Sequence, residues 1–246
     1  MKTKFLVIID LFALLAMAAC NILPGASKPA DSLDVLKPIP TPESLPQSVN
    51  FHDDLNQDIT KDWGLKTISG LEKQLIWSQL GGHLRVELFG VNDSDFAFIN
   101  KNTNYKDVVV QAEVRYLESS AAYVSVICRY SDNGWYEFRI NSQGYYEVVK
   151  FDAYLKDLDK NAYTDLSSGI HRSPLVKTGK EINRLALSCI GKEIKVLINN
   201  EQVFLYRRPL IITDDSFSEG SIGFGVSAKG KSSTDVSFTY IETLKP

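Results

Sequence analysis

The sequence predicts an all-β fold, an antiparallel sandwich of two sheets, and three observations support that prediction. From Phe51 onward the apolar residues recur mostly with a period of two, which is typical of strands with one buried face. Short runs rich in Val, Ile, Tyr and Phe alternate with turn signals built from Gly, Asn and Asp. The chain after residue 50 is roughly 195 residues long, the size of one β-sandwich or barrel.

The body of the chain contains seven runs that are predicted as strands. They cover residues 108–115, 123–130, 135–140, 145–150, 185–190, 194–198 and 236–241. Gly-containing or Asn-rich turn signals follow several of these runs, at residues 132–134, 142–144, 191–192 and 199–200. Short strands at this spacing favour an antiparallel sandwich. Only residues 152–158 are expected to form a turn of helix.

Residues 1–19 have the pattern of a signal peptide. Lys2 and Lys4 precede a short apolar run, residues 5–16, which is too short to span a membrane. The following Met17-Ala18-Ala19-Cys20 resembles the lipobox of bacterial lipoproteins. That resemblance implies that Cys20 is acylated, becomes the first residue of the mature protein, and anchors it outside the cytoplasm on the bacterial cell membrane.

Two departures from the lipobox pattern leave alternatives open. Asp10 lies inside the apolar run, and Met17 stands where a lipobox usually has Leu. Cleavage after Ala18 would give a secreted protein without an anchor, and an uncleaved leader would itself be the anchor.

Residues 20–50 are predicted to form a Pro-rich linker between the lipid anchor and a single domain, residues 51–246. The linker contains no aromatic residue, so it buries too little apolar surface to offset its ordering entropy. Proline favours extended conformations, which makes such a segment a semi-rigid spacer. It contains six of the nine prolines, at positions 24, 29, 38, 40, 42 and 46.

Composition excludes some classes of function. The formal net charge is −3 and no basic cluster is free of acids, so no nucleic-acid partner is expected. His52, His83 and His171 are far apart and have no metal-ligand spacing. P-loop, dinucleotide-binding and nucleophile-elbow motifs are absent from the sequence.

Residues 123–147 are predicted to form two hairpins with a polar outer face. Placing Tyr130 opposite Tyr136, and Phe138 opposite Tyr146, puts Cys128 on the core side. The opposite side then carries Tyr123 and Ser125 together with a charged patch that we treat as a candidate ligand face: Arg129, Glu137, Arg139, Tyr145 and Glu147. Trp135 is placed at the hairpin tip, where it either stacks on a sugar ring or caps the sandwich. The alternative for the patch is a solvated face held by cross-strand ion pairs.

The same hairpin carries a family resemblance. Cys128-Arg129-Tyr130 and residues 133–140, NGWYEFRI, resemble a hairpin of concanavalin A-like, laminin-G-like jelly-roll domains. Residues 183–200 and Gly220-Ser221-Ile222-Gly223-Phe224-Gly225 look like later strands of that family, so the resemblance spans nearly all of the chain after residue 50. It is closest to domains of bacterial envelope lipoproteins, near the 3-keto-disaccharide hydrolase-like domains. The segment Phe151–Lys180 is longer and more polar than is usual there.

The resemblance implies the fold but not an activity, because jelly rolls include lectins, glycosidases and adhesion modules. Glycosidases of this architecture usually carry closely spaced acids such as E-x-D-x-E, and this sequence has no such motif. Glu137 and Glu147, on adjacent predicted strands, are the residues most similar to such a carboxylate pair. Neighbouring arginines would keep both ionised, and an ionised carboxylate is a poor general acid. We therefore expect no catalytic residues.

No cofactor or metal is expected. Some laminin-G-like domains bind calcium through loop acids, but neither Asp53-Asp54 nor Asp214-Asp215 matches a recognisable calcium loop. With Cys20 acylated, Cys128 and Cys189 remain, both on predicted core faces. They form either a disulfide between the sheets or two separate buried thiols.

These observations favour a membrane-anchored, non-catalytic recognition domain that binds glycan or another envelope component. Two alternatives stay open: a glycoside hydrolase-like enzyme, and a structural or protein-interaction module. The sequence does not predict an oligomeric state.

Overall fold

The computed structural model describes residues 49–89, 93–230 and 232–245. The predicted leader, Cys20 and all but the end of the predicted linker lie outside these ranges. β1 (Val49–Asp53) pairs antiparallel with the last strand of the domain, β19 (Thr234–Leu244). Main-chain pairing with β19 begins at Val49, two residues before the predicted start of the domain.

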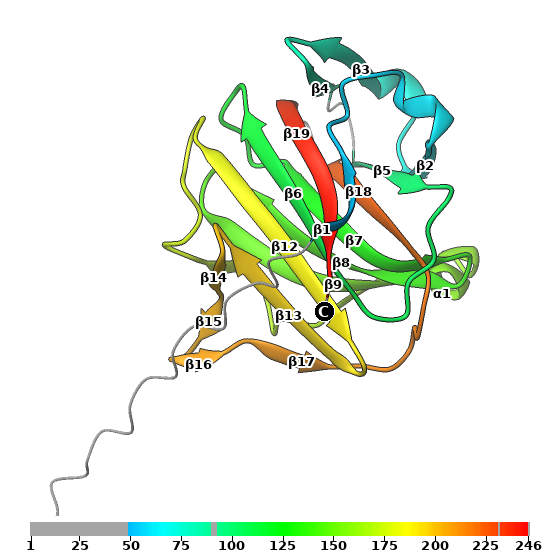
Figure 1. Ribbon diagram of the computed structural model, residues 1–246, viewed down its shortest axis with the longest axis vertical. Coiled ribbons are helices and arrows are strands. Elements are labelled where there is room, and N and C mark those ends of the chain that lie inside the picture. The colour runs from blue at the N-terminus through cyan, green and yellow to red at the C-terminus, as the bar shows by residue number, and fades with distance from the viewer. Residues whose placement is uncertain (1–48, 90–92, 231, 246) are drawn as a thin grey trace, which may run out of the picture. The chain divides into compact units, whose positions relative to one another are not determined.

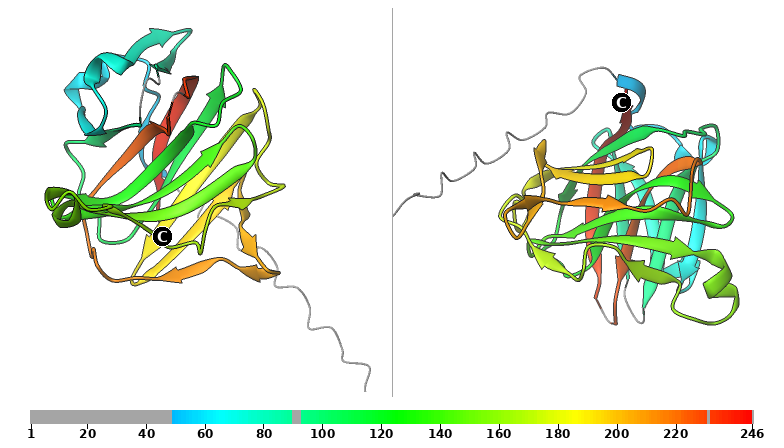
Figure 2. Two further views of the ribbon diagram at one scale, coloured as in Figure 1. Left: turned by 180° about the vertical axis from the view of Figure 1, so that it is seen from behind. Right: turned by 90° about the horizontal axis from the view of Figure 1, so that it is seen from below.

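The described chain folds into two antiparallel sheets that form a sandwich (Figures 1 and 2), as predicted. β1 joins sheet A beside β19, and β17 (Ile211–Thr213) joins it beside β13. The other strands of sheet A lie in the order β14 (Glu201–Gln202), β13 (Glu193–Ile198), β12 (Ile182–Ile190), β6 (Val108–Tyr116), β19, β4 (His83–Leu88) and β3 (Leu75–Leu80).

Sheet B faces sheet A across the core and carries the outer face on which the candidate site lies. β11 (His171–Arg172) pairs with β9 beside the main path of this sheet. That path runs β10 (Tyr163–Asp165), β9 (Tyr145–Asp152), β8 (Gly134–Asn141), β7 (Tyr123–Ser131), β18 (Ser221–Ala228), β5 (Ser94–Asn100) and β2 (Trp63–Ser69).

Few other elements occur in the described chain. A small separate pair is formed by β15 (Phe204–Leu205) and β16 (Arg208–Pro209). The helical elements are η1 (Ile59–Lys61), η2 (Glu72–Gln74) and α1 (Ala153–Asp157). The predicted helical turn is thus confirmed, and the Asp152 side chain caps it by accepting from the Leu155 N–H. In the described residues no helix has the length and apolarity needed to cross a membrane.

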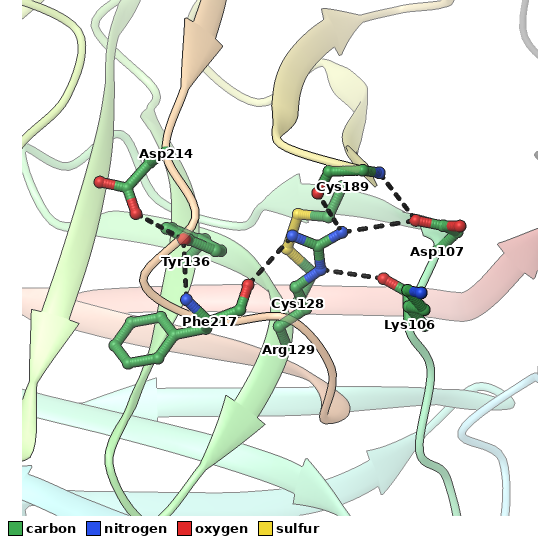
Figure 3. The surroundings of a disulfide bond; sticks show 9 residues. Lys106, Asp107, Cys128, Arg129, Tyr136, Cys189, Asp214 and Phe217 are labelled. Atoms are coloured by element: carbon green, nitrogen blue, oxygen red, sulfur yellow. Dashed lines mark hydrogen bonds and ion pairs between the residues drawn. A yellow bond between two sulfur atoms is a disulfide. The ribbon is translucent and has the colours of Figure 1, made fainter.

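The core between the sheets is built from the inward residues of the period-two strands. Phe224 of β18 stacks on Phe98 of β5, with 5.0 Å between ring centroids, and contacts Trp63 at 5.0 Å. A disulfide joins Cys128 of β7 to Cys189 of β12, so it crosses from sheet B to sheet A (Figure 3). Of the two alternatives left open by the sequence, the structure contains the disulfide.

The outer face of sheet B is half covered. Trp135 and Phe151 stack there at a centroid distance of 3.9 Å and pack with Ile99 and Ile127 in a second apolar cluster. The chain that follows β9 returns across this cluster through α1, and the Lys156 ammonium donates to the Ile68 carbonyl of β2. The long segment noted in the sequence therefore covers this apolar cluster, and its Tyr163 also contacts the polar side chains Asp95 and Arg139 of the same face.

The predicted hairpin register is wrong by two residues, and the predicted faces hold except at Arg129 and at Tyr130, which packs against Trp135 on the outer side. Cys128 lies opposite Tyr136, and Phe138 lies opposite Val148. A β-bulge between Cys128 and Ser131, with Arg129 at a φ of 53°, takes up one extra residue near the turn. Side chains alternate with a period of two, so a two-residue shift leaves each strand's core side unchanged.

Candidate functional site

A row of polar residues crosses the outer face of sheet B and follows directly from strand register. Ser69 lies opposite Asp95, Asp95 opposite Ser227, and Ser227 opposite Tyr123. Two residues beyond Tyr123, Ser125 pairs with Arg139, which in turn pairs with Glu147. Residues opposite one another, or two apart on one strand, share a face, so six strands contribute to one polar surface.

Arg139 is the centre of this surface. Its Nε donates to Glu137 Oε1 at 2.8 Å, and its Nη2 donates to Glu137 Oε2 at 2.9 Å and to Asp95 Oδ2 at 3.2 Å. Its Nη1 lies 3.6 Å from Glu147 Oε1, beyond hydrogen-bonding distance. Three carboxylates from three strands thus surround one guanidinium, and all four residues are buried.

Tyr163 of β10 covers one side of this ionic network. Its hydroxyl donates to Asp95 Oδ2 at 2.6 Å, and its ring centroid lies 4.2 Å from the Arg139 guanidinium carbon. Beside it is a pocket of about 360 Å³. Its walls come from both ends of the polar row, the β10 segment and the loops next to β5 and β18: Ser69, Asp93, Ser94, Asp95, Tyr123, Arg139, Glu147, Val149, Asn161, Tyr163, Asp165, Ser227, Ala228 and Lys229.

The two inner carboxylates have pKa values shifted in opposite directions. Burial raises the pKa of Asp95 to about 6; Arg139 opposes this rise, and the nearby Glu137 charge adds to it. Burial acts in the same way on Glu137, but the ion pair and hydrogen bonds with Arg139 outweigh it and leave the pKa of Glu137 below its ordinary value. Near neutral pH an ionised Glu137 therefore lies behind the pocket wall, and Asp95 in the wall titrates within reach of physiological pH.

The bulge removes Arg129 from the predicted ligand face. Its guanidinium is only 1% exposed and points to the end of the sandwich beside the disulfide (Figure 3). It donates to the main-chain carbonyls of Lys106, Phe217 and Gly191 at 2.9, 3.0 and 2.9 Å. Arg129 thus joins three loops, and the prediction that it faces a ligand is wrong.

The remaining candidates separate into two groups. Arg139 and Glu147 line the pocket, as the hairpin pattern suggested. Glu137 lies behind Arg139 and is not part of the pocket wall. Tyr145 is exposed on β9, the strand of Glu147, and lies outside the pocket. Trp135 is not at a tip: it is 1% exposed in the outer apolar cluster, and its Nε1 donates to Glu137 Oε2 at 3.2 Å.

Asp95 and Tyr163 are pocket residues that the sequence interpretation missed. Asp95 precedes Phe96 and alternates with it and Phe98, so a period-two interpretation of residues 94–100 would have placed the acid on the face opposite the core aromatics. Tyr163 had no comparable signal. It comes from the long segment after β9, and its position depends on β10 pairing with β9.

The acid pairs considered for calcium have other partners. Asp53 accepts from the Leu55 N–H and the Trp63 Nε1–H, both at 2.8 Å, and Asp214 accepts from the Tyr136 hydroxyl at 2.6 Å. Asp215 pairs with Lys192 at 2.6 Å on the surface. Within the described ranges no group of three or more His, Cys, Asp or Glu residues could hold a metal ion.

Comparison with known proteins shows the fold. No protein-family model and no curated protein matches the sequence. Among solved structures, a carbohydrate-binding module, CBM66 from Bacillus subtilis, superimposes with a TM-score of 0.54 at 13% identity, over 75% of this chain and 97% of that one. A GH16 protein from a Bacteroides ovatus mixed-linkage glucan locus gives 0.56 at 9% identity, over 79% and 99%. The laminarinase catalytic domain of Thermotoga maritima gives 0.57 at 7% identity, over 83% and 99%.

The architecture is therefore a concanavalin A-like jelly roll, in agreement with the predicted resemblance. At these identities the likeness establishes the fold alone, and both binding modules and hydrolases share it. The function has to be argued from the pocket.

Proposed function

We propose that this protein is a non-catalytic, lipid-anchored recognition protein of the bacterial envelope, and that it binds glycan in the pocket beside Arg139. The supporting observation is the pair formed by Arg139 Nη1 and Glu147 Oε1, 3.6 Å apart in the pocket wall. Within the described residues Nη1 has no hydrogen-bond acceptor, so a donor and an acceptor stand side by side without bonding each other. A sugar hydroxyl both donates and accepts, and adjacent hydroxyls on one ring match such a pair.

The aromatic walls support the same ligand class. Tyr123, from the polar row itself, and Tyr163, from β10, both line the pocket. Tyrosine offers a flat apolar ring for the C–H face of a sugar and a hydroxyl for its polar edge. A pocket with two such rings and fixed polar groups is typical of sites for small polar ligands.

The extracytoplasmic, membrane-anchored location is part of the same proposal. It rests on the leader pattern that ends at Cys20 and on the Pro-rich segment that follows. The Cys128–Cys189 disulfide supports it independently, because disulfides persist in oxidising compartments and are rare in the cytosol of mesophiles.

Binding to an oligosaccharide array tests the glycan proposal. Wild-type protein from residue 21 onward is expected to bind a subset of glycans. The Tyr123→Ala and Glu147→Gln variants are expected to lose at least about tenfold in affinity, since each removes a pocket contact. Tyr206→Ala is the matched control, because Tyr206 is 83% exposed and does not line the pocket. Equal binding by all four proteins would place the ligand elsewhere and contradict the proposal.

A hydrolase is the second candidate, and the raised pKa of Asp95 is the observation that favours it. A carboxyl group that titrates near neutral pH can act as a general acid, and glycosidases require one beside a second carboxylate. Recognition is favoured because Glu137 is buried behind Arg139 and outside the pocket wall, and because Glu147, which does line the pocket, is held in an ion pair with Arg139 at 3.6 Å.

Product analysis by mass spectrometry separates the two candidates. If the protein is a hydrolase, the array ligand is cleaved by wild type, and Asp95→Asn lowers the rate by about a hundredfold or more. If it is a recognition protein, the ligand is recovered intact after prolonged incubation.

A further inference from the structure

The pocket beside Arg139 carries an excess of negative charge. Four carboxylates line it, from Asp93, Asp95, Glu147 and Asp165, against two cations, Arg139 and Lys229. A fifth carboxylate, Glu137, lies directly behind the wall and takes two of the hydrogen bonds of Arg139. Negative charge therefore exceeds positive charge at this site when its acids are ionised.

The excess is greatest where the site is most buried. Asp95, Glu137 and Glu147 are 8%, 3% and 8% exposed, and Arg139 is the one guanidinium among them. Buried charge without a counter-charge is costly, because neither water nor protein compensates it. Asp165 adds little to this uncompensated negative charge. Its carboxylate already accepts hydrogen bonds from the Ser167 N–H, the Ser167 hydroxyl and the Gly169 N–H.

A second observation points into the same pocket. Glu147 is 8% exposed and lines the pocket, and its carboxylate accepts no hydrogen bond among the described residues, since Arg139 Nη1 lies 3.6 Å away. Asp95, also in the pocket wall, accepts from Tyr163 and Arg139 through one oxygen, Oδ2, which leaves Oδ1 without a hydrogen bond among the described residues. Two buried carboxylates at the pocket wall thus retain capacity to accept hydrogen bonds.

We infer that the pocket selects sugars that carry a protonated amine, as glucosamine units do, over their N-acetylated and acidic counterparts. This inference rests on the proposed glycan-binding function and specifies its ligand class. An ammonium group donates up to three hydrogen bonds and brings the positive charge that the Asp95–Glu147 side of the pocket lacks. A carboxylated or sulfated sugar would instead meet the excess of carboxylates, which disfavours it.

A matched set of oligosaccharides tests this inference by titration calorimetry near neutral pH. The probes are a glucosamine tetrasaccharide, its fully N-acetylated form, and a galacturonic acid tetrasaccharide. Wild type is expected to bind the glucosamine form at least about tenfold more tightly than the acetylated form, with no measurable binding of the acidic one. The preference is expected to weaken at high salt, as for partly exposed charge contacts.

Variants that each remove one carboxylate test whether the preference for the amine arises in the pocket. Asp95→Asn and Glu147→Gln are each expected to reduce the preference for the amine severalfold. Asp215→Asn removes a surface carboxylate that does not line the pocket and is expected to leave the preference unchanged. Glu147→Gln keeps the test decisive if Asp95→Asn does not fold, because Glu147 has no hydrogen bond to lose within the described residues.

The outcomes distinguish the two proposals. Equal or tighter binding of the acetylated or acidic tetrasaccharide overturns the amine preference and leaves glycan binding in place. The same holds if the oligosaccharide array yields only neutral ligands without an amine. Absence of any sugar binding, on the array and in calorimetry, overturns both.

Discussion

Asp95 and Arg139 show how burial gives a few side chains on the outer face of sheet B unusual properties. Each would be an ordinary surface residue on an uncovered sheet. Tyr163 and the segment after β9 cover them, so that the carboxyl of Asp95 loses most of its hydration while the guanidinium is shared among three acids. In the pocket, Asp95, which titrates, therefore accepts a hydrogen bond from Arg139, which stays charged.

The raised pKa of Asp95 has a consequence for stability. The folded state holds this proton up to a pKa of about 6, whereas the unfolded chain releases it near the ordinary aspartate pKa of 3.8. Between those values the native state binds more protons, so this group's contribution to stability falls as pH rises. Asn does not titrate, so the Asp95→Asn variant should not lose stability in this way. Between pH 4 and pH 7 the unfolding free energy of the variant should therefore rise by about 2 kcal/mol relative to that of wild type.

Urea unfolding of both proteins at the two pH values measures this shift. Groups such as Asp214 titrate alike in both and cancel in the difference. A difference in unfolding free energy that does not change with pH would show that Asp95 has an ordinary pKa.

Arg129 is expected to contribute to stability rather than to binding. Arg129→Met keeps much of the side chain's length but leaves the main-chain carbonyls of Lys106, Phe217 and Gly191 without their donor, which should destabilise the fold by about 3 kcal/mol. Arg184→Met is the control, because Arg184 pairs with Glu113 on the surface and should cost less than about 1 kcal/mol. Similar midpoints of chemical denaturation for the two variants would contradict this role.

At the scale of elements, strand positions and faces could be predicted from the sequence but their exact pairing could not. The seven predicted strands correspond to β6, β7, β8, β9, β12, β13 and β19. Period-two alternation fixes which side of a strand is buried, whereas register also depends on turns. Here the bulge at Arg129 takes up one extra residue, and nothing in Cys128-Arg129-Tyr130 signals a positive φ at an arginine.

The same limit applies to the candidate site. Arg139 and Glu147 were predicted because adjacent strands and a two-residue period are local information. Asp95 and Tyr163 lie 44 and 24 positions from Arg139 in the sequence, so their approach depends on the pairing of β5 with β18 and of β10 with β9. Contacts of that kind are decided by tertiary structure.

The disulfide between β7 and β12 ties the two sheets together. It closes a loop across a sequence separation of 61 residues, which should stabilise the fold by about 4 kcal/mol through the entropy of the unfolded chain. The double variant Cys128→Ala/Cys189→Ala is expected to lose roughly that amount in denaturant unfolding. Alkylation of unreduced, denatured wild type should find neither thiol free, and two free thiols would refute the bond.

At the scale of the whole molecule, we propose that the jelly-roll domain is held on a membrane by a lipid on Cys20. Acylation of Cys20 is expected to incorporate a labelled palmitate analogue into the full-length protein in a bacterial host, and Cys20→Ser should abolish it. Wild type that carries no label would remove the anchor from the account while leaving the pocket argument unchanged.

The most direct test of the central claim is the crystal structure of the domain with its tightest oligosaccharide bound. The account predicts a sugar unit between Tyr123 and Tyr163, with hydroxyl contacts to Arg139 Nη1 and Glu147 Oε1. A sugar bound to the outer face of sheet A, or at the loops around Arg129, with the pocket on sheet B empty, would contradict it.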